Sequence, residues 1–346
     1  MMDLKSLLGI ELPIIQAPMA GVQGGALAVA VSNAGGLGSL PCAMLDAGAM
    51  REEIEAIRKQ TARPFNVNFF CHTPPARSAE REAAWRGALA PYFEEMGLDV
   101  RTAAEGGGRT PFGPEAADVL DEFRPAVVSF HFGLPSPELL ARVRGWGSKV
   151  LSSATTVDEA CWLEARGVDA IIAQGLEAGG HRGMFLSEDL DTQVGTLALV
   201  PQVVDAVRVP VIAAGGIGDA RGVLAALALG AAGVQVGTAY LLCPEATTGA
   251  VHRAALTGAP GRLTALTNVF SGGPARGIVN RLMRELGPIS PAAPAFPLAA
   301  PALAPLRAMA ESLGSGDFSP LWSGQNPGAC KEVPAAELTR ELAAGL

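Results

Sequence analysis

The sequence predicts an α/β protein: a (β/α)8 barrel with a smaller domain inserted over its C-terminal face. Short apolar runs alternate with amphipathic segments over most of the first 245 residues, and eight of these runs are strand-like. The turns after the last two runs are rich in glycine and lead into helical segments. Alternating strand and helix patterns are typical of parallel sheets. Glycine-rich turns after strands seven and eight are typical of phosphate-binding barrels.

The individual elements follow from the spacing of the apolar residues. Strands are predicted at 13–17, 36–40, 65–69, 126–131, 149–153, 170–173, 211–214 and 233–236. Helices are predicted at 51–60, 156–165, 194–207 and 220–228, where apolar residues recur every three or four positions. A doubly wound sheet would give much the same local pattern. The two glycine-rich turns favour the barrel.

The chain is predicted to divide into three parts. Residues 1–245 form the barrel, residues 246–315 form a small domain, and residues 316–346 return to the barrel. Six prolines fall within 287–306, so the extent of regular helix there is expected to be limited. The segment DFSPLWSGQN, residues 317–326, is rich in aromatic and polar side chains that suit the lining of a site. The small domain is therefore expected to cover the mouth of the barrel.

Composition excludes several classes of protein. The formal net charge is −8 without long basic runs, which argues against nucleic-acid binding. The five cysteines are scattered, without zinc-ligand spacing, so we expect reduced thiols and no metal site. The N-terminus has acidic residues and an early proline, unlike an export signal, which predicts a cytoplasmic protein. The uncharged stretch 222–244 is interrupted by glycines, so no membrane association is expected.

Common catalytic motifs are missing from the sequence. It contains no G-x-x-x-x-G-K-[ST], no H-E-x-x-H and no G-x-S-x-G. The stretch GGIGDARG, residues 215–222, resembles a dinucleotide-binding fingerprint, but its third glycine comes one position late and it lies far from the first β/α unit. Nucleotide hydrolysis, zinc-peptidase and lipase-type mechanisms therefore have no support.

Polar side chains follow several predicted strands at the point where each strand ends. Gln16 and Met19 follow the first strand, Asn68 lies near the end of the third, His131 closes the fourth, and Gln174 follows the sixth. In a barrel these positions share one face. An apolar floor with a few neutral amides suits a flat heteroaromatic ring with N and O atoms to bind.

The motif AQGLEAGGHRG, residues 173–183, is the strongest single indication of chemistry. Gly179 and Gly180 allow the backbone to approach a bound group, and they precede His181 directly. An imidazole there suits general acid–base catalysis. His131 lies between two phenylalanines, and both a core role and a site role stay open for it.

Other polar residues receive weaker interpretations. His72 and His252 are expected at the surface. Arg182 and Arg276 are candidates for binding an anionic substrate, because guanidinium groups bind paired oxygens, although solvated surface arginines are the alternative. Cys243 lies too far from any predicted base to be a nucleophile.

Six segments in order resemble the nitronate monooxygenases, formerly called 2-nitropropane dioxygenases. They are PIIQAPMAGV, FNVNFF, SFHFG, AQGLEAGGHRG, PVIAAGGIGD and GVQVGTAYL, and they cover residues 13 to about 245. FSGGPARG and FSPLWSGQN are weaker matches. The resemblance implies a TIM barrel with FMN at its C-terminal face. SFHFG together with GGHRG is similar to the class I branch.

The resemblance also implies a set of site residues. The cofactor contacts are Ala17, Pro18, Met19, Asn68, Gln174, Gly179, Gly180, Gly215, Gly216, Gln235, Val236, Gly237 and Thr238. In this set, Gly215 and Gly216 and the turn at Gly237 and Thr238 would hold the phosphate. The implied catalytic residues are His181, which positions the nitronate or takes the α-proton of a nitroalkane, and His131, which helps to bind it.

The class I resemblance implies oxidation of alkyl nitronates, notably propionate 3-nitronate, by O2. In that branch the nitronate passes one electron to FMN, a flavin semiquinone then reduces O2, and no nicotinamide is needed. A monomer or homodimer is expected. One departure stands out, because similar class I enzymes carry tyrosines and a lysine where this chain has Phe296, Ala300 and Ala304.

Three alternatives stay open from the sequence. The nearest is an NAD(P)H:quinone reductase or a FabK-like enoyl reductase on the same flavin barrel. Rapid bleaching of the bound flavin by NADH or NADPH would indicate such a reductase. The second is a flavin-free barrel lyase or isomerase whose glycine-rich turns hold a phosphorylated substrate. The third is a binding protein without catalytic activity. A colourless protein that FMN does not reconstitute would leave only the last two.

Overall fold

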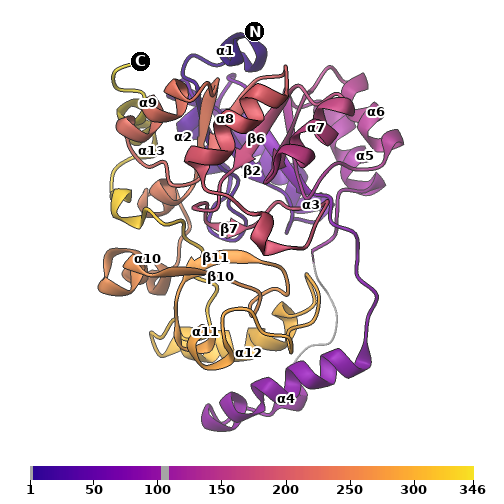
Figure 1. The fold of residues 1–346 in the computed structure, drawn as a ribbon, viewed down its shortest axis with the longest axis vertical. Coiled ribbons are helices and arrows are strands. Elements are labelled where there is room, and N and C mark those ends of the chain that lie inside the picture. Colours follow the sequence, from indigo (N-terminus) through magenta and orange to yellow (C-terminus); the bar gives the residue numbers. More distant parts are fainter. Residues whose placement is uncertain (1–2, 103–108) are drawn as a thin grey trace.

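The computed structural model describes residues 3–102 and 109–346 (Figure 1). Eight parallel strands form one sheet in the order β1-β9-β8-β6-β5-β4-β3-β2. These strands are β1 (Ile14–Gln16), β2 (Gly38–Pro41), β3 (Phe65–Phe70), β4 (Val127–His131), β5 (Lys149–Ala154), β6 (Ala170–Gln174), β8 (Val211–Ala214) and β9 (Gly233–Val236). All eight predicted strands are confirmed, with ends displaced by no more than two residues.

The sheet closes on itself through β1, which lies between β9 and β2. Ile14 pairs with Val234 of β9. On the other side, the amide of Leu37 donates to the carbonyl of Ile14 at 2.9 Å, and the amide of Gln16 donates to Leu37 at 2.9 Å. Because both edges of β1 are paired, the sheet has no free edge there. The fold is the predicted (β/α)8 barrel and not a doubly wound sheet.

One end of the barrel is plugged by apolar side chains. Helix α1 (Leu4–Leu8) packs its leucines against inward-facing strand residues such as Ile15, Leu151 and Ile212. Burying such side chains removes apolar area from water and stabilises the closed end. A cavity for a ligand is therefore left to the opposite end, where the strands terminate.

Helices surround the barrel as the parallel topology requires. They are α2 (Gly25–Asn33), α3 (Ala47–Gln60), α5 (Pro114–Phe123), α6 (Pro137–Gly145), α7 (Val157–Ala165), α8 (Thr196–Ala206), α9 (Ala220–Ala228) and α13 (Ala335–Leu342). The prediction placed α9 correctly and began α3 four residues too late. Helix α3 starts early because the Asp46 carboxylate accepts a hydrogen bond from the Ala49 amide at 2.8 Å, which caps its N-terminus.

A smaller unit covers the carboxyl ends of the strands (Figure 1). Its antiparallel sheet has the order β10 (Thr264–Thr267), β11 (Ala275–Ile278) and β7 (Gly180–His181). Its helices are α10 (Ala250–Thr257), α11 (Arg281–Leu286) and α12 (Ala300–Ser312), and α4 (Ala79–Glu95) packs against α12. Short 3-10 turns complete the chain at Val100–Thr102, Leu190–Thr192, Thr238–Leu242, Ala259–Arg262 and Pro327–Ala329.

Helix α4 joins the smaller unit although its sequence lies between barrel strands β3 and β4. The indole Nε1 of Trp85 donates to the carbonyl of Ala299 at 3.1 Å. Trp85 and Phe93 are buried in one apolar cluster with Leu303 and Phe318. Segments far apart in the sequence therefore share this second core.

The proline-rich segment is only partly helical. Residues 287–299 form turns, and helix begins at Ala300, so the expectation of limited helix is correct for the first half and wrong for the second. Pro301 lies in the first turn of α12, where a backbone N–H has no partner inside the helix. The sheet of β7, β10 and β11 was not predicted.

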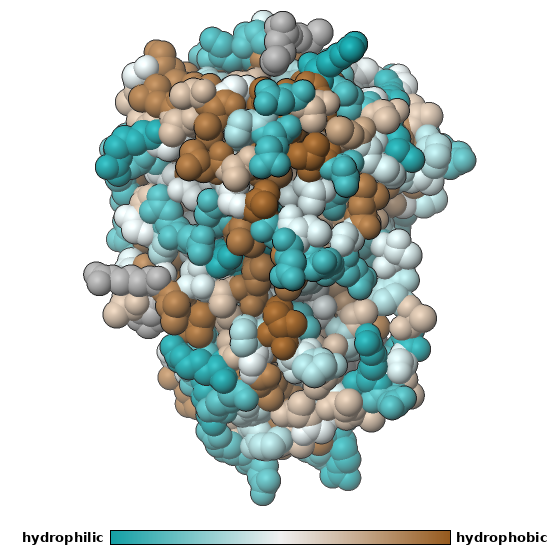
Figure 2. Space-filling view, in the orientation of Figure 1, coloured by the Kyte–Doolittle hydropathy of each residue, from teal (hydrophilic) through white to brown (hydrophobic). Residues whose placement is uncertain are grey.

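No helix within residues 3–102 and 109–346 is long and apolar enough to cross a bilayer. The uncharged stretch 222–244 is divided between α9, β9 and a short 3-10 turn, so it does not form one continuous helix. On the face shown in Figure 2, hydrophobic residues are scattered among hydrophilic ones.

Two substitutions in α4 test this packing in opposite directions. Trp85→Ala removes a buried indole and its hydrogen bond, so we expect the free energy of unfolding to fall by about 3–5 kcal/mol. Gly87→Ala places a methyl group where nothing lies within 4 Å, and we expect a gain of about 0.5–1 kcal/mol. Urea unfolding followed by circular dichroism measures both changes. Equal effects of the two substitutions would contradict the packing.

Candidate functional site

A narrow cavity of about 180 Å³ lies at the carboxyl ends of the barrel strands. Its wall includes the predicted residues Ala17, Pro18, Met19, Asn68, His131, Gln174, Gly179, Gly180, His181, Gly215, Gly216, Gln235, Gly237 and Thr238. Val236 is the exception, because its side chain is buried in the core between barrel and helices. The segment 317–326 also lines the cavity as predicted, through Trp322, Gly324 and Asn326.

Hydrogen bonds from the barrel and from the smaller unit fix His181. It lies in β7, and its carbonyl accepts from Gln174 Nε2 at 2.9 Å and from His131 Nε2 at 3.1 Å. Its ring Nε2 lies 2.9 Å from Ser271 Oγ. The imidazole is therefore held between strand ends of the barrel and the loop before β11.

The contacts of Ser271 favour the tautomer of His181 that carries its proton on Nε2. The Ser271 hydroxyl donates to the carbonyl of Gly273 at 3.3 Å, so its oxygen is left to accept from His181 Nε2–H at 2.9 Å. Nδ1 is then the unprotonated nitrogen, and it has no hydrogen-bond partner among the described residues. Burial, together with the charge of Arg109, lowers the pKa of His181 well below its ordinary value. His181 is neutral near pH 7 and has a free lone pair.

His131 serves a different purpose from His181. Its Nε2 must donate to the carbonyl of His181, because a carbonyl only accepts, and its Nδ1 then accepts from Ser153 Oγ at 3.0 Å. Burial lowers the pKa of His131 to about 4. Since both nitrogens are engaged by the protein, His131 orients the backbone of His181 and has no free nitrogen to offer a ligand.

Arg182 and Arg276, the predicted anion-binding candidates, are buried and bind backbone carbonyls. Arg182 is fully buried and donates to the carbonyls of Gln174 and Gly175 at 2.7 Å each. Arg276 donates through Nε to the carbonyl of Leu176 at 2.8 Å. Both arginines fix the loop that follows β6, and neither lines the narrow cavity.

His72 and His252 are buried, so the expectation of surface positions was wrong. His72 lies against Phe296, with ring centroids 4.9 Å apart. His252 Nε2 donates to the carbonyl of Trp322 at 3.1 Å, and its ring lines the cavity. Both are covered by parts of the smaller unit that are distant in sequence, which local patterns do not reveal.

Aromatic rings enclose His181 on several sides. The ring centroids of Phe70, Phe132, Phe296 and Trp322 lie 6.1, 6.2, 5.0 and 5.4 Å from that of the imidazole. These rings exclude water from the histidine and lower the local dielectric. This desolvation is the main reason why the pKa of His181 is depressed.

The turn after β8 presents bare backbone to the cavity. Gly215 and Gly216 have φ values of +118° and +73°, a region that favours glycine. The turn leads to α9, whose N-terminus has a partial positive charge. On the other side of the cavity, the amide of Gly324 donates to Thr238 Oγ1 at 2.9 Å and joins the turn after β9 to the C-terminal segment. Such surroundings suit a phosphate group.

Two amide side chains in the cavity wall have an oxygen that is available to accept a hydrogen bond from a ligand. Gln235 Oε1 is buried without a partner among the described residues. Asn68 donates to Ser129 Oγ at 2.9 Å, which leaves its oxygen for the cavity. Gln16, also expected there, is instead buried and donates to Gln23 Oε1 at 2.6 Å. The same Gln23 oxygen accepts from the Met19 amide at 2.9 Å, so Gln16 acts on the cavity wall indirectly.

Sequence reasoning missed several residues of the site. Ser271 and Phe70 lie in segments that resemble the family, FSGGPARG and FNVNFF, but neither was singled out, because each meets His181 only through tertiary folding. Arg109 lines the cavity and lies in an irregular segment before α5, where only its residue type hinted at a role. Within the described ranges, no group of three or more His, Cys, Asp or Glu side chains is arranged to hold a metal ion.

Comparisons with known proteins agree with this geometry. The sequence matches the family described as nitronate monooxygenase over residues 2–345. It is 46% identical to a nitronate monooxygenase of Pseudomonas aeruginosa, over 97% of this chain and 96% of that protein. It is 45% identical to a nitronate monooxygenase of Paraburkholderia phytofirmans, over 98% of this chain and 93% of that protein.

Two solved structures are also similar. Nitroalkane oxidase from Streptomyces ansochromogenes has a TM-score of 0.90 and 41% identity, with 99% of this chain and 96% of that chain covered. FabK from Thermotoga maritima has a TM-score of 0.70 and 27% identity, with 99% and 95% covered.

The buried histidines predict a pH dependence of stability. The pKa values of His131 and His252 are lowered from 6.5 to about 4, so the unfolded chain binds protons first as the pH falls. The contribution of the two neutral histidines to the free energy of unfolding is complete above pH 6.5 and is lost as the pH falls from about 6.5 to 4. In this range the free energy of unfolding falls by about 1.4 kcal/mol per pH unit for each titrating histidine. Urea unfolding between about pH 7 and 5 measures this slope. His252→Gln should make it shallower, and constant stability over that range would contradict the burial.

Proposed function

Because the chain belongs to the nitronate monooxygenase family, we propose that it oxidises alkyl nitronates with O2, using FMN held in the narrow cavity. Propionate 3-nitronate represents this substrate class. The observation that carries the proposal is the state of His181: neutral, fixed through Nε2, and with Nδ1 free within a cavity lined by glycine turns.

The residues of the cavity fit FMN in chemistry. The turns at Gly215–Gly216 and Gly237–Thr238 would hold the phosphate against backbone amides and the N-terminus of α9. The unpartnered Gln235 Oε1 and the free oxygen of Asn68 would accept from ring N–H groups. Since the cavity is small for a ligand site, a flavin must lie directly against its wall, which the glycines permit. Bound FMN would supply the redox chemistry, taking electrons from the nitronate and passing them to O2.

His181 supplies the proton chemistry. With a neutral nitroalkane, Nδ1 takes the proton from the α-carbon, and the electron pair of the C–H bond moves into the nitro group to give the nitronate. Ser271 accepts from Nε2–H throughout and keeps the ring in this tautomer. With a nitronate as substrate, no proton has to be removed, so this reaction does not need Nδ1 as a base.

The surroundings of His181 control water and orientation. The aromatic rings exclude water, which keeps the imidazole neutral and protects the reactive nitronate. Gln174 and His131 hold the backbone of His181, so the ring keeps one position relative to the strand ends. Pre-organisation of this kind is a large part of catalytic efficiency.

A reductase that uses NADH or NADPH is the competing proposal, and the similarity to FabK motivates it. Anaerobic mixing separates the two. Rapid bleaching of the flavin by a reduced nicotinamide, together with indifference to nitronates, would replace oxidation of nitronates by a reductase activity.

Replacement of the proposed base is the direct test. We expect His181→Asn to retain FMN and to lose about 10²–10⁴-fold in kcat/KM, because the asparagine fills the space but cannot accept the proton. Oxygen uptake with nitroethane and with propionate 3-nitronate measures this loss, and it should be larger for the neutral nitroalkane. Unchanged activity with both substrates would refute the role of His181.

The glycine turn gives a separate test of cofactor binding. A Cβ on Gly215 would lie 2.8 Å from Thr196 Oγ1 and 3.0 Å from the Ala178 amide, at a φ of +118°. We expect Gly215→Ala to reduce retained FMN about tenfold or more, since strain of about 1–3 kcal/mol distorts the phosphate turn. Gly249→Ala, where nothing lies within 4 Å, is the control. Equal flavin absorbance in the two purified variants would exclude the turn from cofactor binding.

A further inference from the structure

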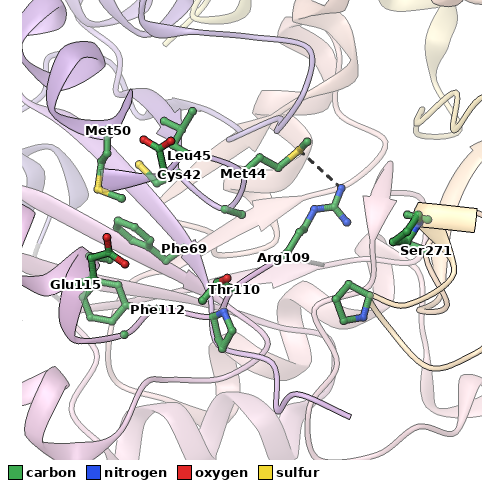
Figure 3. A pocket seen from close by; sticks show the side chains of 18 of the residues that line it. Cys42, Met44, Leu45, Met50, Phe69, Arg109, Thr110, Phe112, Glu115 and Ser271 are labelled. Carbon is green, nitrogen blue, oxygen red and sulfur yellow. Dashed lines mark hydrogen bonds between the residues drawn. The ribbon is translucent and has the colours of Figure 1, made fainter. Parts of the chain in front are cut away.

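A second and wider cavity of about 800 Å³ lies beside the narrow one (Figure 3). The two cavities share Arg109 and Trp322 as lining residues. Of the residues described above as contacting His181, Ser271 and Trp322 line the wider cavity. The proposed oxidation of a small nitronate therefore leaves this space unexplained.

The wall of the wider cavity is mostly apolar. It is built from the segment after β2, from the segment that leads into α5, and from α12 with its preceding turn; its apolar lining residues include Met44, Leu45, Met50, Phe69, Phe112, Phe270, Pro297, Leu303 and Trp322. Met44 is 59% exposed, so a large thioether side chain contacts water at the cavity wall. A concave apolar wall of this size is typical of a ligand site.

Arg109 lies at the boundary of the two cavities, and no anionic side chain within residues 3–102 and 109–346 pairs with it. Its guanidinium lies 5.8 and 5.7 Å from the ring centroids of Phe70 and Phe296. Its Nε is buried without a hydrogen-bond partner among the described residues, and its Nη2 lies 4.0 Å from Met44 Sδ (Figure 3). Partial burial of a cation without a counter-charge among the described residues is costly, and a ligand anion relieves this cost.

Arg109 also lies close enough to His181 to affect it. Its positive charge contributes to the lowered pKa of His181. The rings of Phe70 and Phe296 contact both the guanidinium and the imidazole. An anionic group bound by Arg109 would therefore lie beside the two phenylalanine rings that also contact the imidazole.

Small side chains on α12 leave the space open. Ala300 and Ala304 both line the cavity, one helical turn apart, and each contributes only a methyl group. A larger side chain at either position would project into the volume that these alanines leave. The size of the cavity is thus set by two residues that have no part in the chemistry.

From these observations we infer that the wider cavity binds an unbranched alkyl chain of the nitronate substrate, while Arg109 binds the two-oxygen anionic head beside His181. This inference rests on the proposed function, and it narrows the substrate class to nitronates with a hydrocarbon tail longer than that of the simplest nitroalkanes.

Straight-chain carboxylates test the cavity independently of turnover. They have the same paired anionic oxygens and an alkyl chain, and they are not nitronates. Calorimetric titration of the FMN-loaded protein with acetate, butanoate, hexanoate and octanoate should show the dissociation constant falling about fourfold per added methylene. Affinity that does not change with chain length would overturn the inference.

Matched variants on α12 locate the chain. We expect Ala304→Phe to fill the cavity and remove the gain in affinity beyond butanoate. Ala308→Phe, on the same helix, exposed and outside the cavity lining, should keep the full dependence on chain length. Identical behaviour of these two variants would overturn the assignment of the chain to this cavity.

Arg109→Met tests the head group. We expect this variant to bind every carboxylate more weakly, by a similar factor of about ten or more. The gain in affinity for each added methylene should stay unchanged. Because an uncharged side chain of similar length replaces a buried cation, this variant should fold. Unaltered affinity for acetate and octanoate would remove Arg109 from the proposal.

Oxygen uptake with ethyl, butyl and octyl nitronates separates this inference from the proposed function. A kcat/KM that rises with chain length supports both. Turnover of all three nitronates at the same kcat/KM overturns the chain site alone. Binding of carboxylates that depends on chain length, without turnover of any nitronate, supports the chain site and overturns the proposed oxidation.

Discussion

The carbonyl of His181 is the point on which the site depends. It accepts from Gln174 Nε2 at 2.9 Å and from His131 Nε2 at 3.1 Å, so the ends of β6 and β4 both hold the short strand β7. Strand β7 pairs in turn with β11 of the smaller unit. One peptide group therefore connects the rigid barrel to the unit that covers it. Movement of this group would displace the imidazole, its serine partner and the adjacent glycine backbone together.

The smaller unit is needed for the chemistry as well as for coverage. It supplies Ser271, which fixes the tautomer of His181, and it supplies Phe296 and Trp322, which desolvate the ring. A solvated histidine would be partly protonated near neutral pH and could not act fully as a base. The barrel holds the backbone of the histidine, and the smaller unit fixes its ring and completes its desolvation. This division explains why the site lies at the junction of two apolar clusters.

The sequence predicted the parts of the site that local backbone rules determine. Strand ends follow from apolar runs, and Gly215 and Gly216 follow from the need for positive φ after β8. Arg182 was misinterpreted because residue type indicates charge but not the carbonyls of Gln174 and Gly175 that bind it internally. Ser271 and Arg109 were missed for a related reason, since contacts between distant segments leave no periodic pattern.

The two cavities are under different physical constraints. Around His181, hydrogen-bond donors and acceptors must keep fixed positions, because a displaced tautomer or an added water changes the proton chemistry. In the wider cavity, apolar contact requires only area and shape. Exchanging Ala300 or Ala304 for a larger residue therefore changes the volume without disturbing the hydrogen bonds that hold His181. The size of the substrate can therefore diverge within this fold while the reacting centre stays the same. Arg109 and Trp322, which line both cavities, are where the site of the head group meets the site of the chain.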